Sequence, residues 1–118
     1  MRKKKSFVLI DGDDVGEKID ALIVKGDVVE LLRFTRAVDR AVDRIAALVR
    51  KSGGAVHMAG GDNVLGQVGD VDGFLRTFMK ARRAFCVTFS VGVGASAREA
   101  HVALKAAKGA GTGEIVGA

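Results

Sequence analysis

The chain has 118 residues, 48% of them hydrophobic and 28% charged, which favours one globular domain with a modest core. No apolar run reaches the roughly 18 residues that cross a bilayer, which argues against a membrane partner. The formal net charge of +5 suits an anionic partner such as a nucleotide, but the absence of Tyr and Trp argues against direct binding of nucleic acid.

The first residues are basic, and we expect residues 1–5 to form a flexible tail of a single domain that spans residues 1–118. The apolar run after this tail is short and is soon followed by acids, which is not the pattern of a signal peptide. We therefore expect a cytoplasmic protein. The single cysteine, Cys86, lies in an apolar run, so we expect a buried reduced thiol rather than a nucleophile or a metal ligand.

A buried strand is predicted first, over residues 6–10, and its apolar run ends abruptly in the acidic stretch 11–14. Carboxylates this close together repel one another unless a cation or solvent screens their charge, so an acidic cluster at a strand end is a candidate metal site. A solvated loop is an equally good interpretation. In that case Asp13 and Asp14 cap the next segment or hold a lysine.

Two helices are predicted next. Residues 17–25 form a short helix, and from Asp27 the apolar residues recur at intervals of three and four until residues 52–54, which predicts a long amphipathic helix. The outer face of this helix alternates Arg and Asp. We interpret it as a solvated face rather than as a track for phosphates.

A hairpin with a carboxylate at its bend is predicted between residues 57 and 65. Gly60 and Gly61 supply the backbone freedom for a tight turn and let a bulky ligand approach the main chain. Asp62 then presents a hard oxygen that suits a divalent metal. The alternative is an ordinary hairpin with a solvated Asp in its turn.

The rest of the chain predicts a helix over residues 70–83, a long strand over 85–95, an alanine-rich helix over 97–108 and a short strand over 114–116. Neither His57 nor His101 has a partner at the spacing of metal ligands. We expect both to be surface or hydrogen-bonded residues.

This order of elements predicts an α+β fold: a ferredoxin-like βαββαβ core, with an antiparallel sheet and helices on one face, plus a C-terminal helix and strand. In that topology the first strand ends at the edge where the hairpin turns, so Asp11 and Asp62 meet there. The last helix ends at the same edge and brings Lys105 and Lys108. Acids that hold divalent metals and cations that neutralise a triphosphate are what nucleotidyl transfer needs.

Four motifs in this order resemble the nucleotide-cyclase palm domains, a group that includes the GGDEF diguanylate cyclases, the palm of the CRISPR large polymerase subunit and the stand-alone minimal CRISPR polymerase family. The motifs are Asp11-Gly12-Asp13, Gly60-Gly61-Asp62-Asn63, Ser90-Val91-Gly92-Val93 and Ala107-Lys108-Gly109-Ala110-Gly111. The resemblance spans nearly the whole chain. Because the chain is little more than a palm, it resembles the minimal CRISPR polymerase family most.

This resemblance implies that Asp11, the Gly12 carbonyl and Asp62 hold Mg²⁺ or Mn²⁺. The catalytic residues that it implies are Asp11, Asp62 and the neighbouring Asn63. The residues that we expect to bind nucleotide are Gly12, Asp13, Asp14, Gly60, Gly61, Lys105 and Lys108, with Lys108 on the triphosphate.

The activity that the resemblance implies is the synthesis of a cyclic di- or oligonucleotide signal in bacterial anti-phage defence, by attack of a ribose hydroxyl on an α-phosphate. Ile19 stands roughly where the diguanylate cyclases carry an Asn that reads guanine, so we expect ATP as the substrate. One small palm offers one triphosphate cradle, so we also expect a homodimer. The family further implies a downstream effector that senses the cyclic nucleotide.

Asn63 replaces the second hairpin acid of the diguanylate cyclases and the CRISPR palm, and it offers a neutral oxygen instead. Three alternatives stay open. A protein similar to archaeal GTP cyclohydrolase III would open a purine ring while metal holds the triphosphate. A catalytically degenerate palm would bind nucleotide or a partner and signal by conformation. A phosphotransferase of the haloacid-dehalogenase type also begins with a strand into Asp-x-Asp, but its later motifs have little room here.

Overall fold

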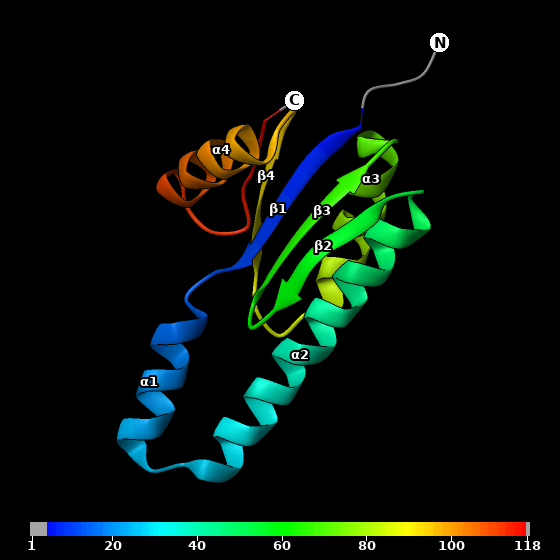
Figure 1. Cartoon of the computed structure of the whole chain (residues 1–118). Helices are drawn as coiled ribbons and strands as arrows, with labels where there is room; N and C mark the ends of the chain where they lie inside the picture. The colour runs from blue at the N-terminus through cyan, green and yellow to red at the C-terminus, as the bar shows by residue number, and fades with distance from the viewer. Residues whose placement is uncertain (1–4, 118) are drawn as a thin grey trace.

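The computed structural model describes residues 5–117, so the predicted basic tail lies outside the described residues except for Lys5. Figure 1 shows a twisted sheet with helices on both sides. The elements are β1 (Ser6–Gly12), α1 (Val15–Lys25), α2 (Val28–Lys51), β2 (Ala55–Gly60), β3 (Asn63–Val68), α3 (Val71–Ala81), the 3-10 turn η1 (Arg82–Ala84), β4 (Phe89–Gly94), α4 (Ala97–Ala110) and β5 (Ile115–Val116).

The five strands lie in the order β2-β3-β1-β4-β5, and β1 pairs antiparallel with both β3 and β4. The first four strands therefore have the ferredoxin-like arrangement, and the predicted α+β palm fold is confirmed. The last strand was predicted, but the way it pairs with the sheet was not. β5 pairs parallel to β4, because the chain returns through the whole length of α4 before it rejoins the sheet.

The core helices α2 and α3 pack on one face of the sheet, as predicted, whereas the C-terminal helix α4 covers the other face. A Cβ atom at Gly66 would lie 2.8 Å from Val49 of α2, and a Cβ atom at Gly92 would overlap the backbone of α4. Gly66 pairs with Val8 and Gly92 pairs with Leu9, which are neighbours on β1 and so point to opposite faces. α4 therefore lies on the face opposite to α2, as Figure 1 also shows.

The main core lies between the sheet and the pair α2 and α3. Its fully buried members include Ile10 on the central strand, Ile45 on α2 and Phe74 on α3. Burying each of these large apolar side chains contributes about 1.5–3 kcal/mol to folding. α1 and the first half of α2 extend beyond the sheet, so they form a wall beside the end of β1 (Figure 1).

The predicted long strand over residues 85–95 is wrong in its first half, because β4 begins only at Phe89. Phe85 turns its ring inward and packs against Phe78 and Phe89, at 6.4 and 5.5 Å between ring centroids. Cys86 follows Phe85 in this irregular segment and is exposed, so the expected buried thiol is also wrong. Within residues 5–117, no helix combines the length and apolar composition that a bilayer-spanning segment needs.

Candidate active site

The end of β1, the turn between β2 and β3 and the end of α4 meet at one edge of the sheet. Asp11 pairs in register with Asn63 on β3 and with Ser90 on β4. The next residue, Gly12, donates its backbone N–H to the carbonyl oxygen of Asp62 at 2.9 Å. The predicted meeting of Asp11 and Asp62 is therefore what the strand register produces.

Gly12 lets the hairpin come this close. A Cβ atom at Gly12 would lie 3.2 Å from both the Cβ and the Oδ2 of Asp62, and 2.8 Å from a methyl group of Val15. Gly61, at the hairpin bend, has φ of 57°, a left-handed conformation that glycine adopts without strain. The small residues at both turns thus place the Asp62 carboxylate against the end of β1.

Lys108 reaches this edge from the last turn of α4. Its Nζ donates to the carbonyl oxygen of Gly12 at 2.8 Å and to Asp13 Oδ1 at 2.8 Å, and it lies 3.1 Å from Asp11 Oδ2. Burial alone would lower the pKa of Lys108, but its contacts with Asp13 and Asp11 outweigh burial and raise it. The ammonium group is therefore held charged against the end of β1.

Asp13 is buried, with 6% of its surface exposed, and both of its carboxylate oxygens are occupied. Four groups donate to it at 2.7–2.8 Å: the hydroxyls of Thr88 and Ser90, the ammonium of Lys108 and the backbone N–H of Gly113. Burial alone would raise the pKa of Asp13, but these hydrogen bonds outweigh burial and lower it. Asp13 thus remains ionised and ties β1 to β4, α4 and the segment that follows α4.

The pKa of Asp62 is shifted in the opposite direction to that of Asp13. Burial raises its pKa, and the negative charge of Asp11 raises it further, while Lys108 compensates only in part. Two carboxylates whose negative charges repel each other are stabilised by a bound cation. The edge therefore favours binding of additional positive charge.

The donor set fits a divalent cation. Asp11, Asp62 and the Gly12 carbonyl present hard oxygens, which Mg²⁺ and Mn²⁺ prefer, and the Lys108 ammonium already contacts oxygens of Asp11 and Gly12. Within residues 5–117 there is no group of three or more His, Cys, Asp or Glu side chains with metal-binding geometry. A metal at this edge would therefore depend on two carboxylates, one carbonyl and water.

Two clefts open on either side of the edge. The first, the α1–α2 cleft, has a volume of about 250 Å³ and is lined by Val15, Gly16, Ile19, Thr35, Val38, Asp39, Gly61 and Asp62. The second, the α4 cleft, has a volume of about 300 Å³ and is lined by Leu9, Asp11, Met58, Asn63, His101, Leu104, Lys105 and Lys108. The carboxylate pair therefore lies between a mostly apolar cleft and a cleft that carries two lysines.

The remaining predicted residues lie close to this edge. Asn63 and Lys105 both line the α4 cleft, and their predicted roles in catalysis and nucleotide binding stay predictions. Gly60 ends β2 at the hairpin. Asp14 is exposed, has φ of 57° and makes no side-chain hydrogen bond to the start of α1. Its predicted contact with nucleotide stays a prediction.

Sequence reasoning missed two parts of the site. His101 lines the α4 cleft, and its spacing of four residues from Lys105 and seven from Lys108 indicates the same helix face. His57, by contrast, is hydrogen-bonded as expected, with Nε2 3.0 Å from the Gln67 side chain. The role of Ser90 as a buried donor to Asp13 was also missed, although a hydroxyl in an otherwise apolar strand indicates a buried polar partner.

Comparisons with known proteins agree with this geometry. The family that matches residues 7–118 is described as mCpol, the minimal CRISPR polymerase domain. No curated protein matches the chain. The fold is similar to that of an EAL/GGDEF domain protein from M. capsulatus, with 18% identity and a TM-score of 0.60 over 98% of this chain and 88% of that chain. It is also similar to a diguanylate cyclase/phosphodiesterase from Caldicellulosiruptor saccharolyticus, with 16% identity and a TM-score of 0.62 over 96% of this chain and 76% of that chain.

Proposed function

The chain belongs to the minimal CRISPR polymerase domain family, and from this premise we propose that it is a nucleotidyltransferase that makes a cyclic di- or oligonucleotide from ATP. The family and the GGDEF-like fold support a nucleotide cyclase-like or polymerase-like activity. The observation that carries the proposal is the meeting of Asp11, Asp62 and Lys108 between two clefts.

The side chains at the edge would have different roles in phosphoryl transfer. A divalent cation held by Asp11, the Gly12 carbonyl and Asp62 would offset the negative charge of the phosphates. Lys108 is held charged at the same edge, so it would contact the phosphate oxygens that become pyrophosphate. Lys105 lines the same cleft and would add a second positive charge.

In the reaction the oxygen of a ribose hydroxyl forms a bond to the α-phosphorus, and the bond from that phosphorus to the bridging oxygen breaks. Pyrophosphate leaves with the electron pair of the broken bond. Asn63 lines the α4 cleft and would orient the hydroxyl by a hydrogen bond. Its amide cannot accept a proton as a carboxylate does, so the proton of the hydroxyl passes to solvent.

The α1–α2 cleft would hold the base. Val15, Ile19 and Val38 supply apolar walls for a flat ring. Asp39 lines the same cleft and can accept from an exocyclic amine, whereas the hydroxyl of Thr35 already donates to the Leu32 carbonyl. Adenine and guanine both carry an exocyclic amine, so the choice of ATP rests on Ile19, which lines this cleft and stands roughly where the diguanylate cyclases carry an Asn that reads guanine.

The proposal has three further features, of which the first comes from the family resemblance. The product would be a signal in bacterial anti-phage defence, and a separate effector would sense it. A cytoplasmic location fits a reaction that consumes ATP. A homodimer would supply the two triphosphate cradles that a cyclic dinucleotide requires.

The experiment is to incubate the protein with each nucleoside triphosphate and Mg²⁺ or Mn²⁺, and to identify products by mass while pyrophosphate is measured. We expect ATP to be consumed and a cyclic adenylate to appear together with pyrophosphate. Excess chelator should stop the reaction, and Asp11→Asn is the matched inactive control. Full activity in excess chelator would contradict the metal mechanism.

The same experiment tests two of the three alternatives. A GTP cyclohydrolase III-like enzyme would consume GTP and produce a formylated pyrimidine without pyrophosphate. A catalytically degenerate module would bind nucleotide and give no product. Either result would overturn the proposed reaction, although the fold would stand.

A further inference from the structure

The tip of the hairpin that α1 and α2 form exposes a cluster of apolar side chains. This hairpin tip consists of Ile23, Val24, Val28, Val29 and Leu32. The exposed fraction reaches 87% for Val24 and 70% for Val29. In Figure 1 the tip lies at the end of the hairpin that is far from the sheet. Elsewhere in residues 5–117, large exposed apolar side chains occur singly, on β2, α3 and α4.

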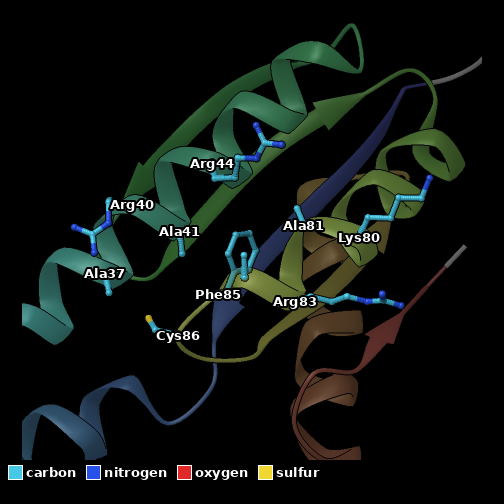
Figure 2. A pocket seen from close by; sticks show the side chains of 10 residues that line it. Ala37, Arg40, Ala41, Arg44, Lys80, Ala81, Arg83, Phe85 and Cys86 are labelled. Atoms are coloured by element: carbon cyan, nitrogen blue, oxygen red, sulfur yellow. The ribbon is translucent and has the colours of Figure 1, made fainter.

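The exposure of the hairpin tip does not come from an irregular turn. Gly26 ends α1 with φ of 71°, and the Asp27 carboxylate begins α2 by accepting from the Glu30 N–H at 3.1 Å. Further along α2 the exposed side chains are charged instead, and Figure 2 shows Arg40 and Arg44 pointing away from the hollow beside this helix. Exposed valines favour a helix less than long charged residues do, so the tip has the composition of a surface that is buried in an assembly.

We propose that the hairpin tip packs against a second copy of this chain. Such a contact rests on the proposed function, which requires two carboxylate edges that face each other. α1 begins at Val15, soon after the edge, and its 11 residues span about 16 Å beyond it. A copy whose edge faces this edge therefore lies alongside the hairpin, and two-fold symmetry makes each tip contact the other copy.

The size of the hairpin tip suits such an interface. At their exposed fractions the five side chains present roughly 500 Å² of surface, which is the size of the largest and often functional patches of monomers. Both tips become buried in a two-fold dimer, so they and the surface that they cover amount to roughly 1,000–2,000 Å² in total. Stable protein–protein interfaces lie in about this range.

The charges around the tip favour a second copy over an anionic surface. Residues 23–33 contain two basic and two acidic side chains, and so have no net charge. Two of these, Arg33 and Glu30, pair with each other at 2.9 Å. The whole chain carries a net charge of +5, so two copies repel each other less at the tip than over their surface on average. An anionic membrane or a nucleic acid would instead require a net positive rim.

The test variant is Val24→Glu/Val29→Glu, which places two charges in the apolar contact. Both valines are exposed and Glu favours helices more than Val does, so the monomer should keep its fold. Sedimentation over a series of protein concentrations measures the dissociation constant of the dimer. Because charges without partners are costly to bury, we expect this constant to rise by about 100-fold or more.

The matched control is Met79→Glu/Val102→Glu, which adds the same charge at exposed apolar positions of α3 and α4. It should dimerise like the wild type. An equal loss of the dimer in this control would indicate a general effect of charge and overturn the inference.

Specific activity gives a second readout of the same interface. At a concentration at which the wild type is dimeric, Val24→Glu/Val29→Glu should be less active. It should regain activity when it is concentrated above its raised dissociation constant. The tip lines neither active-site cleft, and concentration would not repair a damaged active site or a lost fold.

Sedimentation needs no turnover, which separates a wrong interface from a wrong reaction. A wild-type dimer that the tip variant disrupts, in a protein that makes no product, would support the interface and contradict the proposed function. A wild type that is monomeric at all concentrations, or a tip variant whose dimer is as stable as that of the wild type, would overturn the interface. Flotation with vesicles of phosphatidylserine and phosphatidylcholine is the last arm. A wild-type monomer that binds these vesicles through the tip would replace the second copy with a lipid surface.

Discussion

Asp13 holds the active-site edge together through its own hydrogen bonds, while Asp11 and Asp62 face the clefts. Its buried carboxylate accepts from four donors on three separate segments, and one of these donors is Lys108. The position of the Lys108 ammonium therefore depends on a residue that lies outside both clefts. We interpret Asp13 as a positioning residue for Lys108.

Asp13→Asn should destabilise the fold by about 2–3 kcal/mol, because an amide turns two donors toward groups that themselves donate and leaves Lys108 without a buried counter-charge. Urea unfolding measures the difference. The matched control is Asp14→Asn. Asp14 is exposed and its side chain caps nothing, so we expect a change within about 0.5 kcal/mol. Equal effects of the two substitutions would contradict the role of Asp13.

The stability that Asp13 contributes should depend on pH. Its pKa is lower in the folded state than in the unfolded state, where an aspartate titrates near about 3.9. The stabilisation is therefore fully present above the unfolded pKa and is lost as the pH falls through the folded pKa. In metal-free buffer, the difference in unfolding free energy between wild type and Asp13→Asn should shrink below about pH 4. A constant difference from pH 7 to pH 3 would argue against an ionised Asp13.

Asp62 should show a trade-off between activity and stability. Its pKa is raised by burial and by Asp11, so its ionised form costs the folded state free energy above the unfolded pKa. Asp62→Asn removes this cost, and without metal the variant should be at least as stable as the wild type at pH 7. Its turnover should fall by about 100-fold or more, because the proposed catalytic metal would lose a ligand. A variant that loses activity only in proportion to lost folded protein would contradict this assignment.

Among the elements, α4 determines how Lys105 and Lys108 reach the edge. It packs directly on β4, where Gly92 and Gly94 leave no side chain between the strand and the helix backbone. α4 begins with Ser96, whose hydroxyl accepts from the Glu99 N–H at 3.1 Å. The glycines in the strand therefore set the distance of the helix from the sheet.

Gly92→Ala should destabilise the protein by about 3 kcal/mol or more, because the new methyl group would overlap the backbone of Ala100 and Leu104 and push α4 outward. The same displacement would move Lys108 and lower activity. Gly109→Ala is the control within α4: nothing lies within 4 Å of its added Cβ, and it should gain about 0.5–1 kcal/mol of stability. Thermal unfolding of the two variants measures both effects. A tolerated Gly92→Ala would contradict the close packing of α4.

At the scale of the whole molecule, the Asp11 and Asp62 pair and its two flanking clefts form one carboxylate edge in the part of the chain that the structure describes. A cyclic dinucleotide needs two triphosphates held head to tail, and two copies related by a two-fold axis supply both. The homodimer is therefore a consequence of the proposed reaction and stays a prediction.

Specific activity should fall when the protein is diluted below the dissociation constant of the dimer, and sedimentation should show the monomer over the same range. An excess of Asp62→Asn, which keeps its fold, should suppress wild-type activity by forming mixed dimers. An excess of Gly92→Ala should not suppress wild-type activity, because we expect this variant to be unfolded or to have a displaced α4. A monomer whose specific activity is constant at all concentrations would contradict the prediction that the dimer is the active unit.

The amino-acid sequence by itself determined the elements and which ends of them meet. Apolar periodicity predicted the long helix from residue 27, and α2 begins one residue later. The glycine pair Gly60-Gly61 and the following Asp62 placed the hairpin turn at residues 60–62. Hydrophobic patterning restricts which faces are buried, and the order of the elements restricts how strands pair, so the meeting of Asp11 and Asp62 could be predicted.

Only the tertiary structure decided which acid is buried, which face α4 covers and where the cations of α2 point. Asp13 is buried because Ser90 and Gly113, each far away in the sequence, donate to it. Arg40 and Arg83 line the same hollow, although they come from elements that are distant in the sequence. These outcomes depend on contacts between residues that are distant in the chain, and local periodicity carries no information about the partner that such a residue meets.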